Sequence, residues 1–367
     1  MKKLSRFLLL TCFSFFSCGE SKQDDILEIP VDIDQNISLP LSDIVEELIT
    51  VELELTDESL INPDRIKRVL LDENHIIITE MEKILVFNKK GKFVRAIGSR
   101  GQGPGEYTGI RSIAMGEKNR RLFVISSSKI ICYDLDGNCL RESKTDPGWS
   151  VTDMNYINDE LLLVTEQYSR KDEKGLFNHS AVYRLNDELQ IKDSCTIRKT
   201  YFERTGLYIH PHEDFILYRN PTVSLYFSDL YHNMQNPAET VLRDTLYRLE
   251  KNNLIPALKL KFKNNGIDGS GNKFIQLFNM YRSTRYVFAV YRNDLNNNFY
   301  RFCYDTKTGK GYNMQDGYTD DINNIEKRKS IRPLNTDAEI FYYWHTHMNP
   351  NDLEEPNPTL YIGKLKK

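Results

Sequence analysis

The sequence lacks the features that mark several common classes of protein. After residue 20, no stretch approaches the roughly 18 continuous apolar residues of a membrane-spanning helix. Six cysteines without a Cys-x-x-Cys pair do not form a dense disulfide framework. Gly-x-Ser-x-Gly, His-Glu-x-x-His and Gly-Lys-[Ser/Thr] motifs are absent, which removes the usual signatures of hydrolases, metalloproteases and phosphate loops. With a net charge of −3 and no basic stripe, the chain does not suit nucleic acid.

The N-terminus differs from the rest of the chain. A cationic head that ends at Arg6 precedes an apolar stretch from Phe7 to Phe16, which is too short to span a membrane and is typical of an export signal. Ser17-Cys18 follows, and this pair resembles a bacterial lipobox, in which the cysteine is acylated and becomes the mature N-terminus. We therefore expect a signal peptide over residues 1–17 and a tether from a lipidated Cys18 to residue 47. An ordinary signal peptide cut nearby is the alternative.

The residues after Cys18 bear on location. Gly19 to Asp25 resembles the Lys/Gln-plus-acidic export signal of Bacteroidetes surface lipoproteins, although a plain solvated tether explains it as well. We expect an outer-membrane lipoprotein, either periplasmic or surface-exposed. Loss of the three leader cations changes the net charge of −3 to −6 in the mature chain. Of the remaining cysteines, Cys132 and Cys139 flank one hairpin turn, where two free thiols are favoured and a disulfide stays possible.

Short apolar runs recur along the chain and indicate a repeat architecture. Each run is too short for a buried helix, and turn residues bound most of them, which favours strands covered on both faces. Six such runs are present: Ile76–Ile78, Leu122–Ile125, Leu161–Val164, Phe215–Tyr218, Tyr286–Tyr291 and Ile340–Tyr343. A second strand core follows each run: Ile84–Phe87, Ile130–Tyr133, Ala181–Tyr183, Leu246–Leu249, Phe299–Tyr304 and Leu360–Ile362.

The repeats match each other in their turns. The segments Val86–Ile97 (VFNKKGKFVRAI) and Cys132–Ser143 (CYDLDGNCLRES) align aromatic on aromatic and glycine on glycine. Polar residues followed by glycine supply the positive φ that a tight hairpin needs. Six pairs of strands at spacings of roughly 40–70 residues fit the blades of a β-propeller. We predict an all-β, six-bladed β-propeller over residues 48–367; a seventh blade from a different division around Tyr201–Tyr208 is the alternative.

The two ends of this region predict how the ring closes. After the sixth strand pair only Gly363–Lys367 remains, which is too short for an outer strand and its return. Leu48–Leu55 (LITVELEL) alternates apolar and polar residues before the first blade. We predict that this N-terminal strand completes the last blade and thereby removes an exposed sheet edge.

The glycine-rich segment Gly98–Tyr107 (GSRGQGPGEY) lies between two predicted strands. A phosphate loop needs a helix after its glycines, and none is predicted here. We interpret the segment as a structural corner between blades one and two, in which glycines permit positive φ and Pro104 stiffens the turn. Glu106 is expected to hold backbone amides and Tyr107 to pack between blades. The residues of this prediction are Gly98, Gly101, Gly103, Pro104, Gly105, Glu106 and Tyr107.

These residues carry a family resemblance. Phe87–Tyr107 (FNKKGKFVRAIGSRGQGPGEY) closely resembles the blade-joining segment of six-bladed β-propeller lipoproteins of Bacteroidetes, which are similar in style to NHL and TolB-like propellers. Asp244–Phe262 resembles that family's Asp-Thr-hydrophobic-Tyr strand, and Asn357–Lys367 its closing strand. The resemblance covers Leu48 to the C-terminus and implies fold and location; it supplies no catalytic residues.

Two His-x-His pairs are the candidates for a metal site. On a strand, residues i and i+2 share a face, so that each pair offers two imidazoles to one ion. Neither pair has an acidic third ligand at a diagnostic spacing, and a structural role explains both pairs. The candidate residues are His210, His212, His345 and His347.

The sequence favours a binding or scaffolding module over an enzyme. Rigid blades hold variable loops at the two faces and at the mouth of the axis, where a protein, peptide or glycan would bind. We expect no cofactor, no nucleic acid and a membrane contact through the lipid anchor only. The alternative is a metal-assisted hydrolase, lactonase or lyase whose polar residues converge at the axis.

Overall fold

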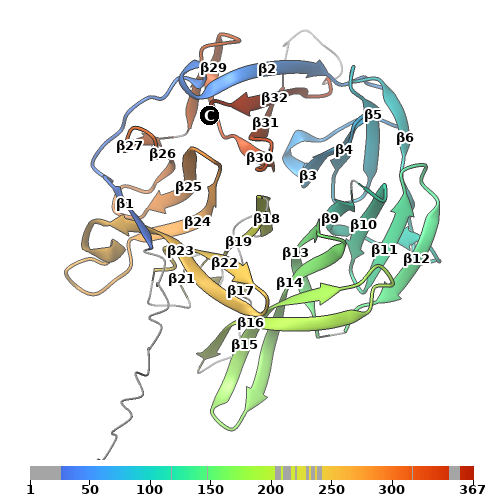
Figure 1. Ribbon diagram of the computed structural model, residues 1–367, viewed down its shortest axis with the longest axis horizontal. Helices are drawn as coiled ribbons and strands as arrows, with labels where there is room; N and C mark the ends of the chain where they lie inside the picture. The colour runs from blue at the N-terminus through green and yellow to red at the C-terminus, as the bar shows by residue number, and fades with distance from the viewer. Residues whose placement is uncertain are drawn as a thin grey trace, which may run out of the picture.

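The computed structural model describes residues 26–116, 118–146, 148–202, 208–209, 216–219, 221–228, 231–232, 236–237, 242–315, 317–346 and 356–367. Six sheets, each with four antiparallel strands and one with an added fifth strand, stand around a common axis, as Figure 1 shows in a view down the ring. In each sheet one strand lies at the axis and the last lies at the rim. The predicted six-bladed β-propeller is confirmed.

The blades follow one another in chain order. Blade one consists of β3 (Arg68–Leu71), β4 (His75–Thr79), β5 (Ile84–Asn88) and β6 (Phe93–Ala96). Blade two consists of β9 (Ile110–Gly116), β10 (Arg121–Ser126), β11 (Lys129–Asp134) and β12 (Cys139–Lys144). Blade three consists of β13 (Ser150–Ile157), β14 (Glu160–Asp172), β15 (Gly175–Leu185) and β16 (Ile191–Phe202). Its last three strands are longer than those of the other two blades, and the β14–β15 hairpin projects from the ring in Figure 1.

The second half of the ring contains the insertions. Blade four consists of β18 (Ile216–Arg219), β19 (Thr222–Tyr226), β22 (Thr245–Glu250) and β23 (Asn253–Phe262). Blade five consists of β24 (Ile275–Arg282), β25 (Tyr286–Asn293), β26 (Asn298–Asp305) and β27 (Lys310–Gln315). Blade six consists of β30 (Arg332–Asn335), β31 (Ile340–His345), β32 (Thr359–Leu365) and β2 (Val45–Glu52).

Short elements connect the blades. They are β7 (Ser99–Arg100) with β8 (Glu106–Tyr107), β17 (Tyr208–Ile209) with β20 (Tyr231–His232) and β21 (Asn236–Pro237), and β28 (Tyr318–Asp320) with β29 (Ile325–Lys329). Helical structure among the described residues is limited to α1 (Leu41–Ile44) and to the 3-10 turns Pro63–Arg65 and Lys263–Gly266. None of the helices in the described ranges is long and apolar enough to cross a membrane.

Blade four differs from the prediction in one strand. The other five apolar runs form the second strands of their blades, but β18, which begins at Ile216 within the run Phe215–Tyr218, is the innermost strand and β19 is the second. The reason is the long insertion between β19 and β22, which separates the second and third strands and removes the short hairpin spacing that identifies them elsewhere.

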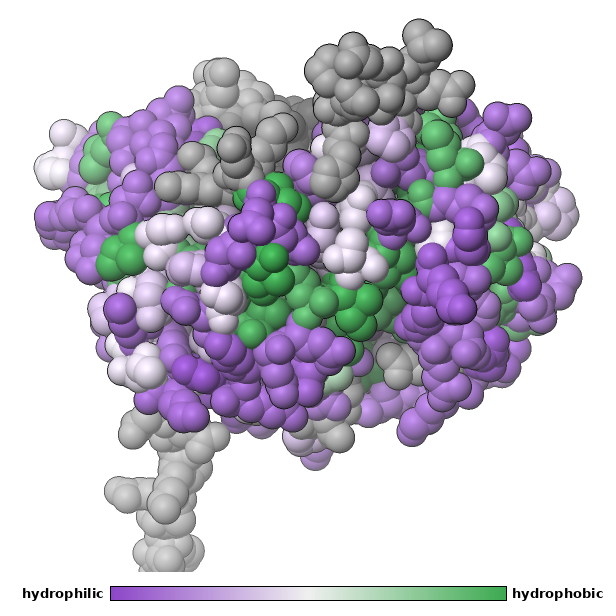
Figure 2. Space-filling view, turned by 90° about the horizontal axis from the view of Figure 1, so that it is seen from above, coloured by the Kyte–Doolittle hydropathy of each residue, from purple (hydrophilic) through white to green (hydrophobic). Residues whose placement is uncertain are grey.

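The closure of the ring is confirmed. β2 pairs antiparallel with β32, with Val51 opposite Leu360, so that a strand that precedes blade one in the chain and the last strand share blade six. The strand covers Val45–Glu52, three residues earlier than Leu48–Leu55. Figure 2 looks onto the rim at the top of Figure 1, where β2 lies, and shows a mostly hydrophilic surface around a hydrophobic patch. Glu46, Glu47 and Glu52 on β2 are exposed, which discourages edge-to-edge pairing with another sheet.

The segment expected to act as a tether packs on the propeller from Leu27 onwards. β1 (Leu27–Val31) pairs in parallel with β23 and adds a fifth strand to the rim of blade four. The chain then crosses blade five, where Ile37 N donates to Asn313 O at 2.8 Å, and reaches α1 beside blade six. The alternation of apolar and other residues explains this docking, because Ile29, Val31 and Ile33 are buried while the residues between them are exposed. We call residues 27–44 the belt.

The core is divided among the six interfaces between blades. Each of six apolar clusters joins one blade to the next, including one between blades six and one that contains Val51, Leu360 and Phe87. Because each cluster needs two neighbouring blades, a single blade buries too little apolar surface to fold alone. The ring is therefore the stable unit.

Candidate functional site

The blade-joining segment lies between β6 and β9, and its strands β7 and β8 pair in parallel. Gly103 N donates to the Glu106 carboxylate at 2.8 Å, and Gly101 N donates to Tyr107 O at 3.0 Å. A strand and not a helix follows the glycines. The segment therefore has no helix N-terminus at which to hold a phosphate.

Two buried tyrosines fix this segment between the blades. Tyr107 Oη donates to Ile97 O at 3.1 Å, and Tyr133 Oη of blade two donates to Gly105 O at 2.6 Å. Burial raises the pKa of Tyr107 to about 12, so that its hydroxyl remains a donor at any physiological pH. These contacts make the segment a packed corner between two blades and not an open phosphate-binding loop.

Of the four candidate metal ligands, one lies in the described part of the chain. His210, His212 and His347 lie outside the described residues, as does Cys18. His345 ends β31 and pairs with Thr359 of β32. Within the described ranges, no group of three or more His, Cys, Asp or Glu side chains is arranged to hold a metal ion. Cys132 is buried and Cys139 exposed, and both are free thiols as favoured from the sequence.

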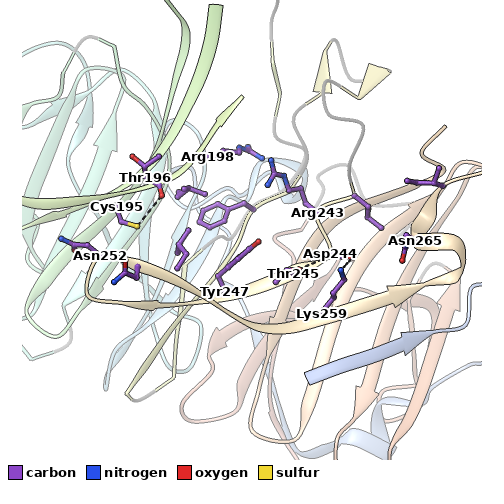
Figure 3. A pocket seen from close by; sticks show the side chains of 16 residues that line it. Cys195, Thr196, Arg198, Arg243, Asp244, Thr245, Tyr247, Asn252, Lys259 and Asn265 are labelled. Carbon is purple, nitrogen blue, oxygen red and sulfur yellow. Dashed lines mark hydrogen bonds and ion pairs between the residues drawn. The ribbon is translucent and has the colours of Figure 1, made fainter. Parts of the chain in front are cut away.

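A groove of about 740 Å³ lies between blades three and four, and Figure 3 shows it from close by. One wall is the outer strand β16 with Thr196, the opposite wall is the β22–β23 hairpin with Tyr247 and Asn252, and the buried Arg198 of β16 lies at the floor. The groove exists because blade three is extended and its outer strand therefore runs beside the neighbouring blade. It is the candidate functional site.

The floor of the groove is held by a buried ion pair. Arg198 Nη2 lies 3.2 Å from Glu166 Oε1, and the two side chains are 4% and 1% exposed. Ser180 Oγ donates to the same carboxylate oxygen at 2.6 Å, and Arg198 Nε donates to Ser180 Oγ at 2.9 Å. Arg198 Nη1 also donates to Ser228 O at 2.7 Å, which ties blade three to blade four. Removing one partner of such a pair leaves a buried charge and costs about 3–5 kcal/mol.

The other wall carries hydrogen-bonding groups at fixed positions. Lys259 Nζ lies 3.4 Å from Asp244, and the two side chains lie side by side in Figure 3. Tyr226 Oη donates to Arg243 O at 2.9 Å and thereby fixes the segment before β22. Amide, hydroxyl, ammonium and aromatic groups therefore line one cavity between two rigid sheets. This combination suits a polar ligand with an apolar face.

Beyond the groove, blade three ends in a cation–aromatic cluster. Lys199 Nζ lies 3.8 Å from the centre of the Phe177 ring, and the Phe177 and Tyr201 rings are 5.6 Å apart. Tyr201 Oη donates to Asp172 at 2.9 Å, and hydrogen bonds from Lys199 and Tyr201 lower the pKa of Asp172 to about 2. Tyr201 is 39% exposed, so the extension presents an aromatic surface to solvent.

A second cavity of about 510 Å³ lies at one mouth of the axis. The ends of the inner strands of five blades line it, with Leu71, Met115, Ile157, Leu217 and Leu334 among its apolar residues. Below it, Arg68 Nη1 of blade one lies 3.1 Å from Asp153 Oδ1 of blade three and donates to Ile113 O at 2.9 Å. Asp153 Oδ2 accepts from Ile216 N of blade four at 3.0 Å. The pair therefore fastens four blades at the axis.

The sequence did not reveal either cavity. Glu166 and Arg198 are 32 residues apart, and the register Ser180–Arg198 between β15 and β16 brings them together. The spacing of the apolar runs gave no signal of the extension, because the interval 165–214 between the third and fourth runs is shorter than the interval 219–285 between the fourth and fifth.

Comparisons with known proteins agree with this architecture. A family model described as a domain of unknown function, DUF4934, matches residues 25–366. Among curated proteins, no sequence matches the chain. Among solved structures, the chain resembles a Bacteroides fragilis protein for which export is predicted, with 19% identity, a TM-score of 0.63, and coverage of 94% of this chain and 100% of that one.

Similarities to other solved structures are weaker. They include the Pan2 WD40 domain of Neurospora crassa, at 11% identity and a TM-score of 0.42 over 82% of this chain and 76% of that one. An oligogalacturonate lyase in complex with manganese has 11% identity and a TM-score of 0.42 over 91% and 98%. Scores of this size carry no argument about function.

Proposed function

The chain belongs to the DUF4934 family, and from that premise we propose that it is a lipid-anchored binding module of the cell envelope. The propeller is a rigid scaffold, and its partner is a protein, a peptide or a glycan that binds in the groove between blades three and four. No reaction is assigned to the groove.

Anchoring is supported by the leader. The cationic head, the short apolar stretch and Ser17-Cys18 together fit lipoprotein processing, with Cys18 as the acylated residue. The predicted export of the similar Bacteroides fragilis protein is in keeping with this location. Acyl chains gain about 0.8 kcal/mol for each buried methylene group, so a multiply acylated Cys18 would keep the protein on an outer membrane, on its periplasmic or its surface side.

Binding rests on one observation, the groove with its fixed floor. Arg198 is held by Glu166, Ser180 and Ser228, so the position of this side chain at the floor does not depend on a ligand. Above that floor, Thr196 and Asn252 are exposed and Tyr247 is half-buried. A preformed site with aromatic and amide groups binds with little loss of conformational entropy. An extended peptide or a short glycan fits such a groove.

A matched pair of substitutions tests the groove. Thr196→Arg places a long side chain into it from the outer strand of blade three, and Thr50→Arg makes the same change on the outer strand of the opposite blade six. The purified full chain is screened against glycan and peptide panels, and the affinity of each hit is measured for both variants. We expect Thr196→Arg to weaken binding about tenfold or more, or about 1.4 kcal/mol, and Thr50→Arg to leave it unchanged. Equal effects of the two variants would disprove a binding site in the groove.

The alternative of a metal-assisted enzyme has its own measurement. Elemental analysis of the same preparation shows whether a divalent metal is retained at a fixed stoichiometry. A tightly held metal that is lost on His345→Ala or on His210→Ala would replace the binding proposal with an enzymatic one. A preparation that binds a panel member without such a metal supports the binding module.

A further inference from the structure

The belt determines where the anchor leaves the propeller. β1 lies on the rim of blade four, and its register places Leu27 opposite Leu258 of β23. Ile29 is fully buried and Val31 nearly so, which fixes this strand to the rim. In Figure 1, β1 lies across the ring from β6 of blade one, as expected for blades one and four of a six-bladed ring. The chain toward Cys18 therefore departs from one defined side.

The distance to the anchor is short. Nine residue steps separate Cys18 from Leu27, and at 3.3–3.6 Å for each step they span at most about 32 Å. A compact domain of about 340 residues has a radius of gyration of about 20 Å and is therefore about 50 Å across. The tether is shorter than the body that it holds.

From these two facts we infer that the propeller stands with the rim of blades four and five toward the bilayer, and that the rim of blade one faces away. The inference rests on the proposed lipidation of Cys18. The tether keeps β1 within about 32 Å of the membrane surface, whereas an inverted body resting on the rim of blade one would lift β1 to about 50 Å, so the inverted orientation is excluded. A partner in the groove beside blade four is then held close to the membrane, whereas blades one and two are open to a partner in solution.

The charges on the rim of blades four and five agree with the proposal that the lipid anchor is the only contact of the protein with the membrane. The exposed side chains of the belt include Glu28, Asp32 and Asp34. Two lysines on this rim already have acidic partners, since Lys261 Nζ lies 3.0 Å from Glu28 and Lys263 Nζ lies 3.2 Å from Asp34. A basic cluster that would attract anionic lipids is therefore not formed by these residues. The tether, and not electrostatic attraction, sets the orientation.

Energy transfer to the membrane tests the orientation. A donor dye is placed at Glu28→Cys on the rim of blade four or at Val94→Cys on β6 of blade one, where both residues are exposed. Both variants carry Cys139→Ser, because Cys139 is exposed whereas Cys132, Cys195 and Cys303 are buried. The full-length lipidated protein is reconstituted into phosphatidylcholine vesicles that contain a head-group acceptor. We expect transfer from position 28 to be several-fold more efficient than from position 94.

A longer tether provides the control. Insertion of about 30 Gly/Ser residues between Gln23 and Asp24 adds about 30 Å of root-mean-square length and is expected to reduce the difference between the two positions. Flotation with the vesicles is measured for every variant. Failure to float would disprove the anchoring itself. Flotation with equal transfer from the two positions, or with greater transfer from position 94, would overturn the orientation alone.

Discussion

At the residue scale, Gly98 shows how one position can control the joint between two blades. Its φ is +65°, and a Cβ there would lie 2.6 Å from Tyr133 Oη and 2.8 Å from Tyr107 Cε1. Both rings are buried at the interface between blades one and two, where they have no room to move. An alanine at position 98 would therefore suffer both a strained backbone conformation and a steric clash.

We expect Gly98→Ala to lower the free energy of unfolding by about 2 kcal/mol or more, measured by urea denaturation. Gly109→Ala in the same connection is the control, because its Cβ would approach only Met81 O, at 3.8 Å. That variant is expected to remain within about 0.5 kcal/mol of the parent protein. Equal stability of the two variants would show that the corner adapts to a side chain.

The ion pair between Arg285 and Asp305 gives a prediction about pH. Arg285 Nε and Nη2 lie 2.9 and 2.6 Å from the two carboxylate oxygens, and hydrogen bonding from this guanidinium lowers the pKa of Asp305 from 3.8 to about 2. A carboxylate with a lowered pKa stabilises the folded state above its unfolded pKa, and the contribution is lost as the pH falls through the folded pKa. The window is therefore pH 4 to pH 2.

We expect Asp305→Asn to destabilise the protein by about 1.5–3 kcal/mol at pH 7, and the difference from the parent to shrink between pH 4 and pH 2. Thermal unfolding of both proteins across this range provides the measurement. Asp136→Asn is the control, because Asp136 is 79% exposed and its pair with Arg95 is a surface contact worth at most about 1 kcal/mol. A difference between parent and Asp305→Asn that stays constant down to pH 2 would contradict this role for the carboxylate.

At the scale of elements, the first strand of the belt, β1, depends on its partner strand β23. β1 has only five residues, one of them proline, and its apolar side chains enter the cluster between blades four and five. Ile29 is 0% exposed, whereas its neighbour Pro30 points to solvent. We therefore expect substitutions of the buried residues of β1 to weaken the docking of the belt, and substitutions of its exposed residues to leave the docking unchanged.

We expect Ile29→Ala to cost about 2–4 kcal/mol and to raise amide exchange over residues 27–37 ahead of the rest of the chain. Pro30→Ala should change neither quantity by more than a small amount, since its side chain faces outward. Hydrogen exchange followed by mass spectrometry distinguishes the two. Unchanged exchange in Ile29→Ala would mean that the belt is held elsewhere, for instance by the contact of Ile37 with Asn313.

The same elements show what the sequence could predict. Runs such as Ile76–Ile78 and Ile84–Phe87 are covered on both faces, so their apolar character identifies them without knowledge of the neighbours. β1 was assigned to a tether because its short alternation, interrupted by Pro30, is too weak to indicate a strand by itself. Its burial results from β23, more than 220 residues later in the chain. The groove was missed for a similar reason, because Glu166 of β14 and Arg198 of β16 are brought together only through Ser180 of β15, which is paired with both.

At the scale of the whole molecule, the pairing of β2 with β32 makes the ring one cooperative body. Each interface between blades contributes one apolar cluster, and the cluster between blades six and one includes Val51 of β2. In an open array of repeats, damage at one end stays local. In a closed ring, loss of one interface leaves both flanking blades with an exposed face.

Two substitutions on the closing strand β2 distinguish a closed cooperative ring from an open array of repeats. Val51 is 4% exposed and packs between blades six and one, whereas Thr50 beside it is exposed. Val51→Asp buries a charge at the closing interface and should cost about 3 kcal/mol or more, while Thr50→Asp should be tolerated. We expect hydrogen exchange in Val51→Asp to rise by a similar factor in all six blades, because opening the closure releases the ring as a whole. Faster exchange confined to β2 and β32 would show that the blades hold together without the closing strand, and the ring would then be an open array whose ends happen to meet.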